Sequence, residues 1–321
     1  MPEVKLEYVM RELIETSDAT LLSWLLPTLK ACGLCVETSG VSTGNINKGG
    51  FEEYHRIMVS NSDYWHARVL LAEGKGELTN DGFIGGKINL LQPKKGFRTS
   101  IDALLLAGAI PVRSHQQVLE LGSGGGIASL VLSIREKSIF VTGVEKHPFM
   151  VELARYNAYQ NGLKNRVKFV LADVIKGSKD LKRDSFDHVM ANPPYMQKGV
   201  GNTSPYPMKA MATVEGEATL EDWVKYGIKV VRPGGSLVFI HRPERISELI
   251  DCLAPEASEF NVMEVFSRND SRTPKRCLVR ARKGKYVSTI KYSRLVLHQN
   301  DGSFRPEVKA VLEKGKAIEF E

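Results

Sequence analysis

The chain has 321 residues, of which 42% are hydrophobic and 25% are charged, and its formal net charge is +7. This composition excludes disordered and fibrous proteins and provides enough apolar surface for one large or two moderate globular domains. The sequence contains no apolar run of about 18 residues and does not begin like a secretory signal, so we expect a cytoplasmic protein that does not span a membrane.

Residues 1–80 are predicted to form a small α+β domain with the order strand, helix, strand, strand, helix. Its strands are expected at 8–16, 34–38 and 54–60, and its helices at 19–32 and 63–73. Ser17 or Asp18 is predicted to cap the first helix. The glycine-rich residues 39–50 are expected to form a flexible loop, and 74–87 a linker.

The N-terminal segment carries few groups suited to nucleic acid or metal. Residues 1–80 hold seven Lys or Arg against eleven Asp or Glu, so this domain is a poor candidate for binding nucleic acid by itself. Cys32 and Cys35 form a C-x-x-C pair, but no second pair or His cluster follows. We interpret both cysteines as ordinary small apolar residues and expect no metal site.

From about residue 82 the pattern alternates between apolar strands and amphipathic helices. The strands are expected at 117–123, 139–145, 167–174, 185–192, 236–242, 261–267 and 276–284, and the helices at 126–137, 148–162, 220–231 and 244–254. Near-continuous apolar strands between helices indicate a parallel sheet covered on both faces. No helix separates the last two strands, so they should pair as a hairpin. The predicted fold class is therefore α/β: a doubly wound, Rossmann-like sheet of seven strands whose last strand forms an antiparallel edge.

Polar and glycine residues follow successive strands of this predicted sheet. Gly122, Gly124 and Gly126 make a turn in which the backbone can approach a ligand closely. Glu145 ends the next strand, where doubly wound folds place the acid that binds ribose hydroxyls. A nicotinamide dinucleotide would fit these features. However, Asp173, which could accept a hydrogen bond from an adenine amine, and the end of the fourth strand do not favour it.

The fourth strand ends in Asn192-Pro193-Pro194-Tyr195. Alone, this tetrapeptide would be interpreted as an ordinary turn. In register with the glycine turn, Glu145 and Asp173, it resembles the class I methyltransferases that use S-adenosylmethionine and act on planar amino nitrogens. The resemblance implies that Asn192, Pro193 and Tyr195 are catalytic. It also implies a cofactor site formed by Ser100, Asp102, Glu120, Gly122, Gly124, Gly126, Glu145, Asp173 and Asn192.

The chemistry of such enzymes explains the tetrapeptide. The lone pair of an exocyclic amine is delocalised into its ring, so the amine is a poor nucleophile. An Asn carbonyl oxygen and the carbonyl of the following Pro can each accept one amine hydrogen and stabilise the developing positive charge. The prolines fix φ and so make these acceptors rigid. The ring of Tyr195 offers a face on which a base can stack.

Several further stretches resemble the bacterial transfer-RNA adenine-N6 methyltransferases that act at position 37, beside the anticodon. These stretches are 90–111, 147–163, 190–195, 214–223, 232–242 and 294–312. The resemblance implies a transfer-RNA substrate that Lys94, Lys95 and Arg98 face; the alternative interpretation of these residues is a solvated loop. Lys209 stands where many relatives have an arginine, and a lysine cannot make the same bidentate phosphate contact. Residues 1–80 resemble a small family described as signal-transducing domains.

Three alternatives remain open at this point. Relatives with the same tetrapeptide also methylate guanine N2 in ribosomal RNA or glutamine N5 in peptide release factors. The non-enzymatic alternative is an RNA-binding protein that retains the fold. His188 and His241 lie within apolar strands, and we interpret them as packed or hydrogen-bonded rather than catalytic.

Positive charge is concentrated near the C-terminus. Residues 268–294 contain ten Lys or Arg and one Asp, a balance of +9, so the rest of the chain carries −2. This concentration suits a face that binds a polyanion such as RNA, with Lys275, Arg276, Arg280 and Arg282 as its contacts. It suits equally a solvated strand edge that is kept basic against aggregation.

Overall fold

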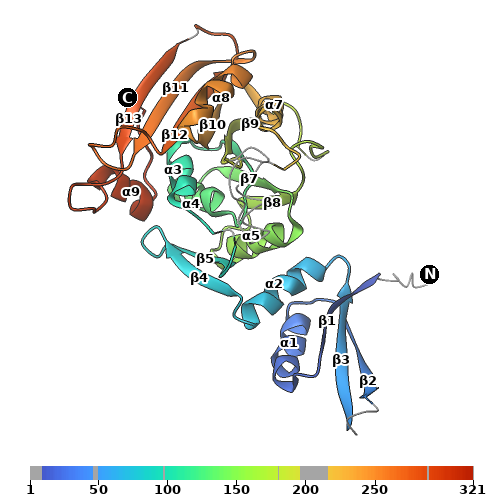
Figure 1. Cartoon of the computed structure of the whole chain (residues 1–321). Helices are drawn as coiled ribbons and strands as arrows, with labels where there is room; N and C mark the ends of the chain where they lie inside the picture. Colours follow the sequence, from blue (N-terminus) through green and yellow to red (C-terminus); the bar gives the residue numbers. More distant parts are fainter. Residues whose placement is uncertain are drawn as a thin grey trace. The chain divides into compact units, whose positions relative to one another are not determined.

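The computed structural model divides the chain into two compact units, Met1–Leu78 and Thr79–Glu321 (Figure 1). It describes residues 9–45, 50–96, 98–179, 181–195, 216–287 and 289–320. Lys209, predicted to contact RNA, lies outside the described residues. Within the described part of the chain, no helix has the length and apolar character needed to cross a bilayer.

The first unit is a three-stranded antiparallel sheet, in the order β1-β3-β2, with two helices. Its elements are β1 (Met10–Thr16), α1 (Ala19–Ala31), β2 (Val36–Asn45), β3 (Gly50–Ser60) and α2 (Tyr64–Gly74). Asp18 caps α1 by accepting the N–H of Leu21, and Cys32 directly follows the helix as a free thiol. The loop predicted over 39–50 is wrong for 39–45 and for Gly50, because β2 and β3 pair as far as Asn45 and Gly50, and residues 46–49 lie outside the described residues. This ribbon lacks the alternating apolar pattern that signals a strand, but backbone ladders form without it.

The second unit begins with a two-stranded sheet of β4 (Leu78–Phe83) and β5 (Ile88–Pro93). The linker predicted over 74–87 is therefore wrong for most of its length. Gly85 and Gly86, which suggested flexibility, have φ values of +63° and +81° and form the turn between the two strands. Positive φ is the conformation for which a turn recruits glycine.

An eight-stranded sheet forms the centre of the second unit, in the order β13-β11-β12-β10-β9-β6-β7-β8. Its strands are β6 (Gln117–Leu121), β7 (Phe140–Glu145), β8 (Val167–Leu171), β9 (Phe186–Ala191), β10 (Val231–His241), β11 (Ala257–Phe266), β12 (Arg276–Lys283) and β13 (Ile290–Val296). All are parallel except β12, which runs antiparallel to both β10 and β11. The predicted α/β fold class is confirmed.

Two details of the sheet differ from the prediction. The reversed strand β12 is inserted between β10 and β11 instead of forming the edge, and β13 is an eighth strand that pairs with β11. β13 was missed because its outward residues are basic or exposed: Ile290 is 47% exposed and Tyr292 63%. Such a strand buries too little apolar surface to stand out in the sequence.

Helices cover both faces of this sheet (Figure 1). Their bounds are α3 (Ile101–Ala109), α4 (Ile127–Arg135), α5 (Pro148–Gln160), α7 (Leu220–Val230), α8 (Ile246–Leu253) and α9 (Pro306–Lys314), with a 3-10 turn η1 at Pro243–Arg245. One apolar core joins the sheet to α3, α4, α5 and α9, and a second joins it to α7 and α8. Because β6 to β10 are parallel, their carboxyl ends meet at one edge, where a doubly wound sheet forms its ligand site.

Candidate active site

A cavity of about 380 Å³ lies at the carboxyl ends of the parallel strands. It is lined by most of the residues predicted to bind cofactor or take part in catalysis: Ser100, Asp102, Glu120, Gly122, Gly124, Glu145, Asp173, Asn192 and Tyr195. Arg98 and Arg276, predicted to contact RNA, also line it. Gly126 and Pro193 do not, although they directly adjoin lining residues. The structure thus brings together groups from positions 98 to 276 of the chain.

Two glycines of the turn after β6 are required by different packing neighbours. Gly122 has φ +68°, and a Cβ there would lie 2.6 Å from the Trp223 ring. Gly126 has φ +90°, and a Cβ there would lie 2.5 Å from Phe169. The absence of side chains therefore lets α7 and β8 pack closely against the turn. Gly126 serves packing and does not line the cavity.

Carboxylates occupy the places where a doubly wound nucleotide site receives phosphate. Glu120 accepts the N–H of Ser129, in the first turn of α4, at 3.1 Å, and the Ser129 hydroxyl at 2.5 Å. Glu145 accepts the N–H groups of Gly124 at 3.0 Å and His147 at 2.9 Å. A pyrophosphate here would meet two acids and find these donors already used. The site therefore does not suit a dinucleotide.

Burial strongly shifts the pKa of the Glu120 carboxyl. Its side chain is inside the protein, and burial raises its pKa to about 8, against the effect of the bonds from Ser129. Near neutral pH this carboxyl is therefore mostly protonated.

Asn192 and Tyr195 follow β9 and are connected to the start of α3. The Tyr195 hydroxyl lies 2.9 Å from Asp102 Oδ2 and 2.5 Å from Asn192 Oδ1. Ser100 is the N-cap of α3 and accepts the N–H of Asp102, which is only 6% exposed. The helix start thereby holds a buried carboxylate beside the tetrapeptide.

Residues 98–244, which contain most of this cavity, match the family model described as the methyltransferase small domain. Residues 98–244 form a methyltransferase domain. The predicted resemblance of this region to methyltransferases is confirmed.

Two curated relatives and one solved structure extend the comparison. The chain is 24% identical over 220 residues to a tRNA1(Val) (adenine(37)-N6)-methyltransferase of Haemophilus influenzae, covering 68% of this chain and 90% of that protein. A protein of the same name from Yersinia enterocolitica is 23% identical over 239 residues, which is 74% of this chain and 93% of that protein. The crystal structure of a predicted O-methyltransferase from Agrobacterium tumefaciens is 25% identical, with a TM-score of 0.57, and the match covers 68% of this chain and 98% of that one.

S-adenosylmethionine is the cofactor that a methyltransferase domain implies, and the cavity of this domain fits it. Ile127, Val144, Met150 and Val174 supply apolar walls for an adenine ring. The acids Asp102, Glu145 and Asp173 surround the same space and suit hydroxyls and cationic groups. The cavity also has the size of a small-molecule pocket, which is commonly about 300–1,000 Å³.

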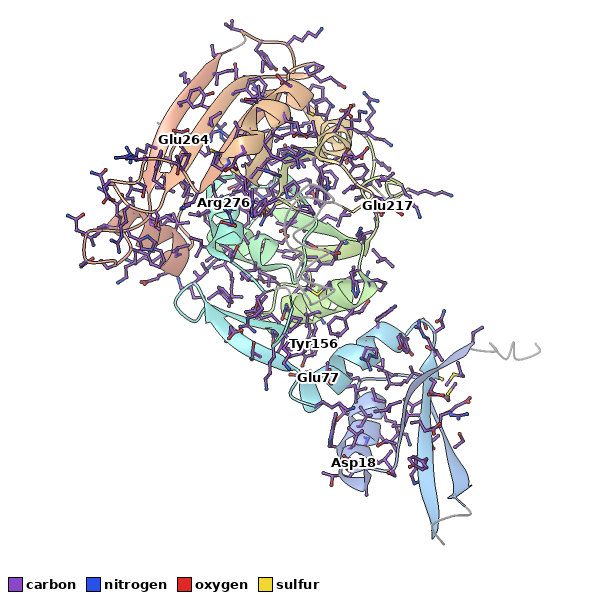
Figure 2. All side chains as sticks on the ribbon, in the orientation of Figure 1. Asp18, Glu77, Tyr156, Glu217, Glu264 and Arg276 are labelled. Atoms are coloured by element: carbon purple, nitrogen blue, oxygen red, sulfur yellow. The ribbon has the colours of Figure 1, made fainter. Side chains whose placement is uncertain are left out.

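Arg276 lies at the start of β12, where Figure 2 labels it, and it lines the methyltransferase domain's cavity. Its Nε lies 2.9 Å from Asp102 Oδ2, and its guanidinium lies 4.6 Å from the centre of the Tyr195 ring. A base that stacks on Tyr195 must therefore use the other face of the ring or displace Arg276.

The two histidines near the site are packed or hydrogen-bonded, as predicted. His188 contacts Ser236 Oγ at 2.7 Å and Gln116 Oε1 at 2.9 Å. His241 is fully buried and meets the Tyr195 ring edge-on, with the ring centres 5.3 Å apart. Burial lowers the pKa of each imidazole to about 4, so both are neutral at physiological pH.

The first group of residues predicted to contact RNA directly precedes α3 in the chain. Lys94 and Lys95 are exposed but do not line the cavity. Arg98 lines the cavity and is also bonded to β4 and β5, through Asp81 Oδ2 at 2.8 Å and the Pro93 carbonyl at 3.0 Å. Arg98 therefore also joins the two-stranded sheet to the site.

The basic C-terminal segment does not form a single face. Because β12 is antiparallel to β10, Arg276 lies by the carboxyl end of β10, whereas Arg282 pairs with Ser236 in the middle of that strand. Arg282 contacts Glu259 at 3.3 Å, and the guanidinium of Arg280 lies 4.3 Å from the Phe320 ring. Of the four predicted contacts in this segment, Arg276 lines the cavity, while Lys275, Arg280 and Arg282 do not.

The alternative interpretation of that segment, a basic strand edge, describes part of it. β13 is the outer strand of the sheet, and its Lys291 and Arg294 are exposed. Charged side chains on an outer strand oppose edge-to-edge pairing with other chains.

Other lining residues were not predicted. Lys146 and His147 directly follow β7, and Arg242 directly follows β10. Their positions at strand ends could have identified them, because such positions surround the ligand site of this fold. Trp223 lies on α7 and reaches the glycine turn, which nothing in its local sequence indicates.

Proposed function

We propose that the protein transfers the methyl group of S-adenosylmethionine to the N6 amine of an adenine in RNA, at position 37 of a transfer RNA. One observation carries this proposal: Asn192 and Tyr195 line the same cavity as the glycine turn, Glu145 and Asp173. The relatives named as adenine-N6 methyltransferases support the acceptor. The tetrapeptide alone would also suit other planar amines.

In the proposed reaction the chain supplies alignment and charge stabilisation. When bound, S-adenosylmethionine supplies an electrophilic methyl group. Asn192 and the backbone carbonyl of Pro193 accept the two hydrogens of the incoming amine and stabilise the positive charge that develops on its nitrogen. Tyr195 stacks against the base and limits its motion, a contact worth about 1–3 kcal/mol. No side-chain nucleophile is needed, because the rate gain comes from positioning.

The remaining acids hold the cofactor. We assign Glu145 to the ribose hydroxyls and Asp173 to the adenine amine, as their places after β7 and β8 suggest. Asp102 and Ser100 lie next to the tetrapeptide and are assigned to the amino-acid end. Lys94, Lys95 and Arg98, which precede α3, would contact the RNA backbone. The target base would turn out of a single-stranded loop to reach the cavity.

The decisive experiment supplies methyl-labelled cofactor together with separated transfer RNA, ribosomal RNA and protein fractions. We expect label in transfer RNA, recovered as N6-methyladenosine after digestion. Label in ribosomal RNA as N2-methylguanosine, or in a protein fraction, would replace the proposed acceptor with one of the alternatives. Absence of label from every fraction, with RNA binding retained, would support the non-enzymatic alternative.

A matched pair of variants tests the role of Asn192. Asn192→Ala should reduce methyl transfer by at least about 100-fold while RNA affinity stays within a few-fold, because the lost oxygen acts on the transition state. Asn300→Ala, at an exposed asparagine in a turn, should leave both quantities unchanged. Equal loss of RNA binding and methyl transfer in Asn192→Ala would instead indicate a structural residue.

A further inference from the structure

The Tyr195 hydroxyl has one hydrogen but lies at hydrogen-bond distance from two acceptor oxygens. Its oxygen lies 2.9 Å from Asp102 Oδ2 and 2.5 Å from Asn192 Oδ1. A phenol has one hydrogen, and neither an ionised carboxylate nor an amide oxygen can donate one. The hydroxyl can therefore satisfy only one of these oxygens, and the other would face it lone pair to lone pair at hydrogen-bond distance.

Asp102 Oδ2 is the stronger of the two acceptors for the Tyr195 hydrogen. Its Oδ2 also accepts the N–H of Arg276 Nε at 2.9 Å, and its side chain is 8% exposed, so Asp102 takes part in an ion pair at a buried position. A hydrogen bond to a charged acceptor is about twice as strong as one between neutral groups. Burial and the nearby Asp102 both raise the pKa of Tyr195, so the phenol retains its hydrogen for this bond.

With its hydrogen donated to Asp102, the Tyr195 oxygen can only accept a hydrogen bond. Arg276 is one donor to this oxygen. The other group beside it is the amide of Asn192, whose NH₂ and oxygen exchange places when the amide turns by half a turn about its Cβ–Cγ bond. The two ends of the amide have nearly the same size, so the turn changes the hydrogen bonds and not the packing. In the turned orientation the Asn192–Tyr195 contact and the Tyr195–Asp102 contact each have one donor and one acceptor.

We propose that Asp102 and Tyr195 are positioning residues that orient the Asn192 amide. Asn192 Nδ2 donates to the Tyr195 oxygen, Tyr195 donates to Asp102, and Arg276 holds Asp102. Asn192 Oδ1 then points away from Tyr195 and can accept a hydrogen bond from an amine. The opposite orientation would present NH₂ to an incoming NH₂. This inference rests on the proposed function only in identifying what Asn192 Oδ1 accepts.

A kinetic cycle tests the role in catalysis. Tyr195→Phe keeps the ring for stacking and removes the hydroxyl, so kcat should fall about tenfold or more while KM for RNA and the affinity for S-adenosylhomocysteine change less than about threefold. Asn192→Asp has two equivalent oxygens and no orientation to set. In that background Tyr195→Phe should change kcat less than about twofold, because the two substitutions remove the same interaction.

The control is Tyr159→Phe, which removes the hydroxyl of a tyrosine that is 62% exposed on α5 and should change nothing. If Tyr195→Phe lowered kcat equally in both backgrounds, or left it unchanged, the hydroxyl would not orient Asn192.

A second measurement needs neither RNA nor methyl transfer. Full-length protein labelled with ¹⁵N-asparagine gives side-chain amide signals, and the pair absent from Asn192→Ala belongs to Asn192. In Tyr195→Phe one hydrogen of that pair should lose its hydrogen bond and shift, whereas Tyr159→Phe should leave both in place. Unchanged Asn192 signals in Tyr195→Phe would overturn the inference. A shift in a protein that methylates no RNA would uphold it and reject the proposed function alone.

Discussion

Individual carboxyl groups in the methyltransferase domain do different work although they lie in one cavity. Glu145 is bonded to two backbone N–H groups, Asp102 is paired with Arg276, and Glu120 is buried under the first turn of α4. Burial raises the pKa of Glu120 to about 8. The environment of Glu120, and not its residue type, therefore sets its charge at neutral pH.

Glu120 should make the stability of the protein depend on pH. Its pKa is about 8 in the folded protein and 4.5 for an unperturbed glutamate, so between these two pH values the folded state holds a proton that the unfolded state has lost. The free energy of unfolding should therefore fall as pH rises through this window, by up to about 1.4 kcal/mol per pH unit.

Glu120→Gln removes that titration. Thermal melts of the two proteins without cofactor should coincide near pH 5 and separate towards pH 8, with the glutamine variant the more stable at the higher pH. A constant difference across the range would mean that Glu120 stays charged when folded.

At the scale of elements, the glycine turn allows three secondary structures to approach one another. Gly126, the N-cap of α4, lies against Phe169 of β8, and Gly143 of β7 leaves room for the same ring, since a Cβ there would lie 2.5 Å from it. Phe169 thus packs where side chains on two neighbouring elements would otherwise lie. This packing fixes the turn that forms one wall of the cavity.

Gly126→Ala should destabilise the protein through both backbone and packing. Gly162→Ala is the matched control, because Gly162 also has a positive φ, +69°, but has nothing within 4 Å of its added Cβ. The control should lose about 1–2 kcal/mol from the backbone alone. Gly126→Ala should lose about 1–3 kcal/mol more from overpacking against Phe169. Urea denaturation measures both, and equal losses would show that Phe169 moves aside freely.

At the scale of the whole molecule, the cavity is built entirely from the second unit, since its lining residues begin at Gly96. The first unit has its own sheet and buried residues, including Leu25, Leu29 and Ile57. A chain beginning at Thr79 should therefore keep a cooperative melt and bind S-adenosylhomocysteine within about twofold of the full-length affinity, because the cofactor contacts are local. Calorimetry of both proteins checks this, and loss of binding in the shorter chain would give the first unit a part in the site.

Local pattern alone determined the alternation of strands and helices from β6 to β12, because buried parallel strands are apolar runs between amphipathic helices. It also placed the glycine turn, Glu145, Asp173 and Asn192 at strand ends, which the parallel topology brings to one edge. The tertiary structure decided which distant groups meet there. Arg276 and Asp102 are 174 positions apart, and their ion pair follows from β12 entering the sheet beside β10. Because β12 is an extended strand, it places Arg276 and Arg282 towards opposite ends and divides a charge cluster that is continuous along the chain. Sequence spacing sets the secondary structure because that depends on near neighbours, whereas the partners of long charged side chains depend on strand order, which no local pattern contains.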